Sequence, residues 1–223
     1  MVTGASRGAG RGIARALGAA GWRVYLTGRT VGPKDAAAVT DAGGDGMALG
    51  VGRADDASVA ALFDRVDADG GRLGLLVNEA AAISDALTGP APFWEKPLAL
   101  SEVIDVGLRS AYVSSWYAAP LLLRGDRGLI AFTSSPGAAC YMHGPAYGAQ
   151  KAGLDKMAAD MAVDFAGTGV CTVSIWMGIL LTERMRRAFD GRPEALAAFA
   201  DHAETPEFNG RIIDALYRDP DLP

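Results

Sequence analysis

A tyrosine and a lysine lie four residues apart in the segment PAYGAQK, at Tyr147 and Lys151. If this segment is helical, both side chains share one face. A tyrosine has an ordinary pKa of about 10, and a neighbouring ammonium group favours the phenolate and lowers that pKa. We therefore expect Tyr147 to exchange a proton with a substrate oxygen near neutral pH, as a general acid or base.

Two serines, Ser134 and Ser135, stand at the end of the predicted strand that precedes this segment. Ligands of parallel α/β sheets bind beyond the carboxyl ends of the strands. A serine hydroxyl at this position can hold the oxygen of a substrate carbonyl. Tyrosine and lysine are often four apart by chance, but their combination with a serine at a strand end is more specific.

A glycine-rich segment, TGASRGAG, follows a short apolar run at the start of the chain and precedes a predicted helix. Gly4 permits a tight exit from the strand, Gly8 lets the backbone approach a pyrophosphate, and Gly10 lets the helix pack near the strand. The free N–H groups of the helix then point at the phosphates. This context favours a dinucleotide site over a glycine-rich turn without a ligand.

The residues after the second predicted strand indicate which dinucleotide binds. An acidic side chain there would bind the ribose 2′-hydroxyl of NAD, but this chain has Arg29. A guanidinium suits a 2′-phosphate because it is planar, always charged and bidentate. Arg7, beside Ser6 in the glycine loop, can approach the same phosphate. The sequence therefore predicts NADP(H) in preference to NAD(H), the alternative for each arginine being a solvated surface charge.

Strand-like and helix-like runs alternate along the whole chain, which predicts parallel strands joined by right-handed crossovers. The expected fold is a Rossmann-type, doubly wound parallel α/β sheet in one domain spanning residues 1–223. Ser58 is expected to help cap the third helix. We predict strands at residues 1–3, 23–27, 47–51, 73–77, 129–133 and 170–176. We predict helices at residues 13–20, 36–42, 58–66, 100–123 and 145–165, and a mostly helical stretch at 183–216 that Pro193 and Pro206 interrupt.

Composition excludes several classes of protein. The net charge of −5 argues against a general nucleic-acid binder. No apolar run approaches the roughly 20 residues that span a bilayer, and the chain runs directly into the glycine loop without a signal peptide. Cys140 and Cys171 match no zinc motif, so no metal is expected. We expect a cytoplasmic protein that binds neither nucleic acid nor membrane.

The order of these motifs resembles the short-chain dehydrogenase/reductase family, which carries TGxxxGxG, a serine and YxxxK. The resemblance covers nearly the whole chain. A closer likeness, to the branch that contains dehydrogenase/reductase member 1, is carried by VYLTGRT, FWEKP, VGLRSAY, SSPGAACYM and YGAQKAGLDKMAADMA.

This resemblance implies a role for each matched residue. Tyr147 is the acid/base, Lys151 lowers its pKa and binds the nicotinamide ribose, and Ser135 orients the substrate. Asn78 supports the sheet near the cofactor, and Thr182 meets the nicotinamide carboxamide. The implied reaction is hydride transfer between the nicotinamide and a carbonyl or alcohol carbon.

Several positions depart from the family pattern. Glu79 and Ala81 replace the second Asn and the Gly of the family's NNAG element. Gly107 stands where the family has a catalytic Asn, so we expect a proton relay that is altered or rebuilt around Asp105 or water. Arg53 follows the position of an adenine-binding Asp and is expected to contact the adenine or the phosphate. These departures leave an alternative open: a dinucleotide-sensing or regulatory protein without turnover.

A variable substrate lid is expected at residues 180–205, with an apolar pocket for a bulky hydrophobic carbonyl substrate. The alternative for its apolar residues is ordinary core packing. An apolar stripe on the Tyr147 helix must face the sheet or another subunit, and relatives pair through this helix, so we expect a homodimer or homotetramer. The lid residues are Leu180, Leu181, Met185, Phe189, Leu196 and Phe199, the opposite wall is Phe93, Trp94, Tyr141 and Met142, and the stripe is Leu154, Met157, Met161 and Phe165.

Overall fold

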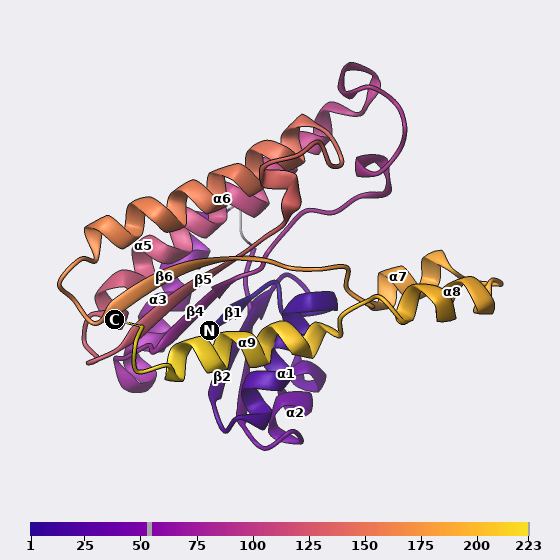
Figure 1. Cartoon of the computed structure of the whole chain (residues 1–223). Helices are drawn as coiled ribbons and strands as arrows, with labels where there is room; N and C mark the ends of the chain where they lie inside the picture. The colour runs from indigo at the N-terminus through magenta and orange to yellow at the C-terminus, as the bar shows by residue number, and fades with distance from the viewer. Residues whose placement is uncertain (53–54, 223) are drawn as a thin grey trace. The chain divides into compact units, whose positions relative to one another are not determined.

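A computed structural model describes residues 1–52 and 55–222 (Figure 1). They form two compact units. The first comprises Met1–Gly50 with Met177–Pro220, and the second comprises Val51–Trp176 with the residues from Asp221 onward. The single domain expected from the sequence stays a prediction.

The first unit is built around three parallel strands in the order β3-β2-β1. Leu26, at the centre of this sheet, lies opposite Val2 on one side and Ala48 on the other. Both Val2 and Leu26 are completely buried, as expected where helices cover a parallel sheet. Its elements are β1 (Val2–Thr3), α1 (Gly8–Ala19), β2 (Arg23–Gly28), α2 (Pro33–Thr40), β3 (Asp45–Gly50), α7 (Glu183–Ala188), α8 (Pro193–Ala200) and α9 (Pro206–Arg218).

Helices α1 and α9 lie side by side in this unit, where two glycines allow their backbones to approach closely (Figure 1). A Cβ on Gly12 would lie 2.3 Å from the Pro206 Cβ, and a Cβ on Gly210 would lie 2.6 Å from the Ala16 Cβ. At the other end of α9, the Trp22 indole N–H donates to Asp214 at 2.6 Å. These contacts fix α9 along α1, and α1 begins in the glycine loop.

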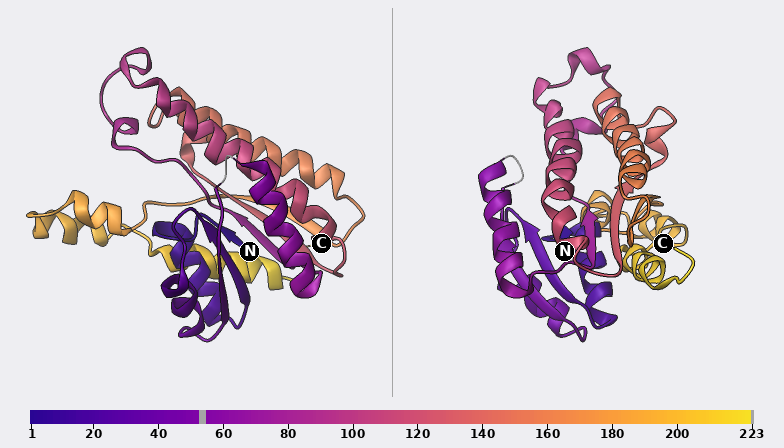
Figure 2. Two further views of the ribbon diagram at one scale, coloured as in Figure 1. Left: turned by 180° about the vertical axis from the view of Figure 1, so that it is seen from behind. Right: turned by 90° about the vertical axis from the view of Figure 1, so that its left-hand side faces the viewer.

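The second unit is built around three parallel strands in the order β4-β5-β6. Asn78 ends β4 opposite Phe132, and Ser134 ends β5 opposite Trp176. Figure 2 shows α3, α5 and α6 running along these strands. The elements are α3 (Asp56–Gly70), β4 (Leu75–Asn78), α4 (Glu102–Ile104), α5 (Ser110–Leu122), β5 (Gly128–Ser134), α6 (Pro145–Asp164) and β6 (Val170–Trp176), with 3₁₀ turns η1 (Asp85–Leu87), η2 (Phe93–Glu95), η3 (Leu98–Ser101) and η5 (Pro136–Ala138).

Strand orders 3-2-1 and 4-5-6, with helices between the strands, are those of the two halves of a doubly wound Rossmann fold. The predicted fold class is confirmed. No helix among the described residues has the length and apolar character needed to cross a bilayer.

Two local predictions are corrected, and a third is confirmed. The predicted helix at 100–123 is broken: η3 and α4 lead into a π-helical turn, η4 (Asp105–Arg109), before α5 begins. Asp55, rather than Ser58, caps α3, because its carboxylate accepts the Ala57 N–H at 3.1 Å. The predicted interruptions of the helical stretch 183–216 are confirmed: it is three helices, and Pro193 and Pro206 each occupy a first helical position, which suits proline.

Candidate active site

The glycine loop of the first unit has the geometry of a phosphate-binding turn. Gly4 and Gly8 have φ angles of 68° and 56°, which a residue with a side chain rarely adopts. A Cβ on Gly10 would lie 2.5 Å from the Gly4 carbonyl oxygen. The loop therefore requires all three glycines, and α1 starts at Gly8 with its first N–H groups at the loop. These residues fit a dinucleotide pyrophosphate.

Two further predicted contacts lie near this loop. Thr182 caps α7, and its methyl group would lie 3.8 Å from a Cβ on Gly8. Ser6 lies beside the end of β2, because a Cβ on Gly28 would lie 3.8 Å from the Ser6 hydroxyl. Thr182 and Ser6 thus lie at the loop, and the cofactor contacts predicted for them stay predictions.

The two arginines proposed for the 2′-phosphate are both exposed. Arg7 is the residue before α1, and Arg29 directly follows β2. The proximity of Gly28 to Ser6 places the backbone of Arg29 at the glycine loop. Arg53, the third arginine considered, lies outside the described residues.

In the second unit, Ser135 and Tyr147 come together at the end of β5. The Ser135 hydroxyl lies 3.0 Å from the Tyr147 hydroxyl and accepts the Gly137 N–H at 3.2 Å. A Cβ on Gly137 would lie 2.7 Å from the Tyr147 ring, so this glycine makes room for the phenol. The two hydroxyls can therefore bind one substrate oxygen together.

Lys151 lies one helical turn after Tyr147 in α6, and its side chain is buried. Its ammonium group lies 5.5 Å from the centroid of the Tyr147 ring and donates to the Thr133 carbonyl at 2.9 Å. The Ser134 hydroxyl donates to the Lys151 carbonyl at 3.3 Å. Lys151 is thereby held between α6 and β5, on the same helix face as Tyr147.

The pKa of Tyr147 corrects one expectation. Burial raises this pKa above the ordinary tyrosine value, and the Glu79 carboxyl raises it further, while the hydrogen bond with Ser135 lowers it. The sequence predicted that Lys151 would lower the pKa of Tyr147, but the net shift of this pKa is upward. Burial also lowers the pKa of Lys151, against the opposing influence of Glu79 and Asp155.

Glu79 is a site residue whose role the sequence did not reveal. Its Oε2 atom is shielded from solvent, and its carboxyl is hydrogen-bonded to Thr133. Burial raises the pKa of Glu79, whereas Thr133 and the Lys151 ammonium lower it. The sequence shows that Glu79 replaces an asparagine of the family pattern. It does not show that Glu79 lies near Thr133 and Lys151, because these residues belong to other segments of the chain.

Asn78 anchors the end of β4 to a helix. Its side-chain amide donates to the Ser115 hydroxyl of α5 at 3.0 Å, and its backbone carbonyl accepts a hydrogen bond from the Thr133 hydroxyl at 3.1 Å. Asn78 is buried. It therefore supports the strand ends beneath Ser135 and Lys151.

The position of the missing family asparagine is filled by another residue. A Cβ on Gly107 would lie 2.5 Å from Nε2 of Gln150, which is only 2% exposed. Asp105 is exposed and interacts with Arg109. The buried Gln150 amide, rather than Asp105, occupies the space beside Gly107.

His143 is a second residue that the sequence did not connect to the site. Its ring meets the Tyr147 ring edge-on, with centroids 5.0 Å apart. It has a φ of 60°, which is uncommon for a residue with a side chain. Burial and the charge of Lys96 lower the pKa of His143.

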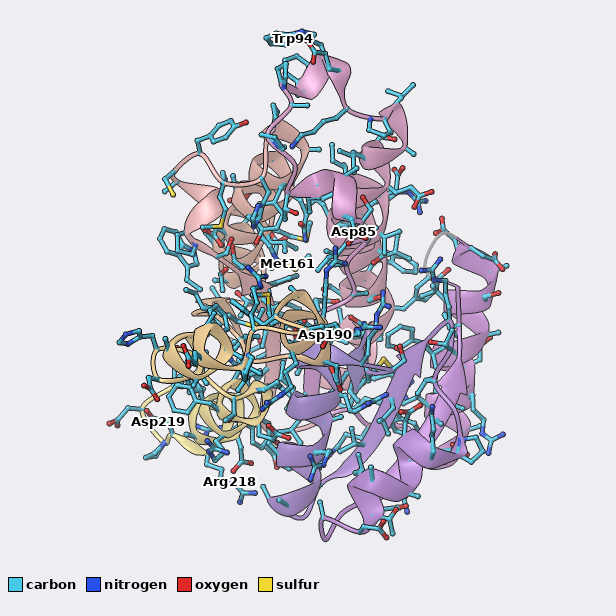
Figure 3. The ribbon with its side chains drawn as sticks, turned by 90° about the vertical axis from the view of Figure 1, so that its right-hand side faces the viewer. Asp85, Trp94, Met161, Asp190, Arg218 and Asp219 are labelled. Carbon is cyan, nitrogen blue, oxygen red and sulfur yellow. The ribbon has the colours of Figure 1, made fainter. Side chains whose placement is uncertain are left out.

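The apolar residues proposed for a substrate pocket lie in both units. In the first, the rings of Phe189 and Phe199 pack 5.1 Å apart and join α7 to α8. In the second, Trp94 and Tyr141 are 72% and 82% exposed, and Figure 3 shows Trp94 at the outer end of its segment. In the stripe on α6, Leu154 is buried, and α6 packs against β5 and β6.

Comparisons with known proteins match this chain to one family, the short-chain dehydrogenases. A family model described as short chain dehydrogenase matches residues 1–193. Dehydrogenase/reductase SDR family member 1 from Homo sapiens is 39% identical, and the match covers 100% of this chain and 75% of that protein. The Mus musculus protein of the same name is 38% identical with the same coverage.

A solved structure shares the fold across the full length. The crystal structure of a metagenomic short-chain oxidoreductase in complex with NADP superimposes with a TM-score of 0.79 and is 27% identical. The match covers 100% of this chain and 90% of that one.

Proposed function

Because the chain belongs to the short-chain dehydrogenase/reductase family, near the branch of member 1, we propose that this oxidoreductase uses NADPH to reduce a hydrophobic carbonyl compound. The observation that carries the proposal is the pair of hydroxyls on Ser135 and Tyr147, 3.0 Å apart beside a buried lysine. The reverse reaction, oxidation of a secondary alcohol, uses the same groups.

The proposed cofactor is a nicotinamide dinucleotide, which supplies the hydride. The absence of an acid after β2 and the exposure of two arginines favour NADP(H), and the similar solved protein was found with NADP. The residues proposed to hold the cofactor are Gly4, Ser6, Arg7, Gly8, Gly10, Arg29, Asn78, Lys151 and Thr182.

The chain's own groups would handle the proton. Ser135 would orient the substrate oxygen, and the Tyr147 hydroxyl would donate its proton to that oxygen as charge develops there. A raised pKa keeps Tyr147 protonated at neutral pH, which is the form that donates a proton in carbonyl reduction. Lys151 would stabilise the phenolate that remains.

A Tyr147→Phe variant tests this chemistry. We expect NADPH consumption with apolar ketones to fall by about 10²–10⁴-fold, because the proton donor is lost. Binding of NADPH, followed by fluorescence, should be unchanged. Tyr112→Phe is the matched control, since Tyr112 is an exposed residue of α5 with no proposed role in cofactor or substrate binding. Full activity of Tyr147→Phe would contradict the assignment.

A second function, dinucleotide sensing without turnover, is favoured by one observation. The Gln150 amide fills the space beside Gly107, so the family's relay asparagine has no direct replacement there. A sensor would bind NADPH but show no turnover with any ketone, and Tyr147→Phe would then change nothing. Measured turnover of the unaltered chain decides between the two functions.

The cofactor preference is tested separately with Arg29→Asp. A carboxylate would repel the 2′-phosphate, so we expect NADPH affinity to fall at least tenfold while NADH affinity holds or rises. Arg15→Asp is a suitable control, because Arg15 lies two turns into α1 and pairs with Glu207. Equal losses for both dinucleotides would refute the assignment of Arg29.

A further inference from the structure

A carboxylate already occupies the amino end of α1. Oε2 of Glu183 accepts the Gly8 N–H at 3.1 Å, and Oε1 accepts from Nη1 of Arg11 at 3.1 Å. Glu183 follows Thr182 and is the first residue of α7, so it reaches the glycine loop from far along the chain. All of these residues belong to the first unit.

The residues of the glycine loop place no anion at the positive amino end of α1. The residue before α1 is Arg7, which makes no capping hydrogen bond, and the first turn of α1 contains no acidic residue. The positive end of a helix attracts a carboxylate or a phosphate through the same N–H groups. Burial raises the pKa of Glu183, but hydrogen bonds from its own backbone N–H and from the Gly8 N–H, with the charge of Arg11, outweigh it and lower the pKa, so the group is an anion at neutral pH.

Arg11 is held independently of Glu183. Its Nη2 lies 3.3 Å from the buried Asp35 carboxylate and also donates to the Ser6 carbonyl. Asp35 in turn accepts the Gly32 N–H at 3.0 Å. The guanidinium therefore remains at the loop when Glu183 leaves and can serve another anion.

We propose that Glu183 is an internal competitor for the phosphate site, which must release Gly8 before the dinucleotide pyrophosphate can bind. The inference rests on the proposed dinucleotide function and adds a residue that sets cofactor affinity. The Glu183 side chain is 52% exposed, so it can turn into solvent at little cost. Because Glu183 begins α7, its release changes the start of the lid segment when the cofactor binds.

Removal of the carboxylate charge tests the proposal. In Glu183→Gln, the shape is kept but the competing anion is lost, and we expect the dissociation constant for NADPH to fall about three- to tenfold. Inorganic pyrophosphate, used as a second probe in competition with NADPH, should gain affinity in the same direction. Glu207→Gln is the matched control, because Glu207 of α9 pairs at 2.8 Å with Arg15 of α1, which lies two turns beyond the loop.

Hydrogen exchange on the unaltered chain gives a readout that needs no variant. NADPH should change the exchange of backbone amides in 183–190 if Glu183 leaves the loop. Equal or weaker NADPH binding by Glu183→Gln would overturn this inference alone, since the glutamate would then belong to the binding form of the loop. An unaltered chain that binds neither NADPH nor pyrophosphate would overturn the proposed function and this inference with it.

Discussion

At the Tyr147 hydroxyl, burial and a neighbouring carboxyl act together to retain the proton. Both raise the pKa of Tyr147, and the Ser135 hydroxyl opposes them. The protonated phenol is the form that acts as an acid in carbonyl reduction. Reduction should therefore be active below the Tyr147 pKa and be lost as the pH rises through it.

Glu79→Gln should change the pH above which ketone reduction is lost. The substitution removes a negative charge that raises the pKa of Tyr147, so that pKa falls. The alkaline limb of the kcat/KM profile for ketone reduction should shift to lower pH. Glu95→Gln, an exposed acid in the same unit, is the control. An unchanged limb, or a shift to higher pH, would show that Glu79 does not act on Tyr147.

The grouping of Ser135, Tyr147 and Lys151 at one place could be predicted from the sequence, but their ionisation could not. Ser135, Tyr147 and Lys151 were selected by order and spacing, and the structure brings them together. The direction of the Tyr147 pKa was predicted wrongly, because the sequence shows the lysine four residues away and not the burial. The contact of Glu183 with Gly8 joins segments 175 residues apart, which no local pattern discloses.

Among the elements, the pair α1 and α9 depends on glycine at the point of closest approach. A Cβ on Gly210 would lie 2.9 Å from the Ile13 carbonyl oxygen, a backbone atom that cannot turn aside. Overpacking of this kind costs about 1–3 kcal/mol. Since α1 begins in the glycine loop, the packing of α9 also supports the proposed cofactor site.

Gly210→Ala should therefore lower the free energy of unfolding in urea by about 1–3 kcal/mol. Gly70→Ala is the control, because Gly70 ends α3 with nothing within 4 Å of a built Cβ. That change should be neutral or stabilise by up to about 1 kcal/mol through helix propensity. A stable Gly210→Ala would mean that α9 can move away from α1 without loss.

The existence of the elements was predictable, whereas some of their boundaries were not. Alternating apolar runs placed all six strands to within a few residues. The helix predicted to begin at residue 13 begins at Gly8, because the glycines of its first turn have low helix propensity and gave no helical pattern. The interruption at η4 involves the side chain of Gln150, which is distant in sequence.

For the whole molecule, the predicted homo-oligomer is supported by exposed apolar residues on two helices. Tyr112 and Trp116 lie four apart on α5 and are 53% and 61% exposed, and Val163 on α6 is 73% exposed. We expect light scattering to give two or four times the chain mass of 23.0 kDa. Trp116→Glu should shift this mass toward the monomer, whereas Leu98→Glu, at a 90% exposed site, should not. A monomer at all concentrations would refute the prediction.

The contact between Gly107 and Gln150 makes the two positions mutually dependent over evolutionary time. Any side chain at position 107 requires the Gln150 amide to leave its buried place. An asparagine introduced at position 107 alone would therefore displace a side chain of the helix that carries Tyr147. A smaller residue at position 150 would remove this conflict, so the paired change should be tolerated better than the change at position 107 alone.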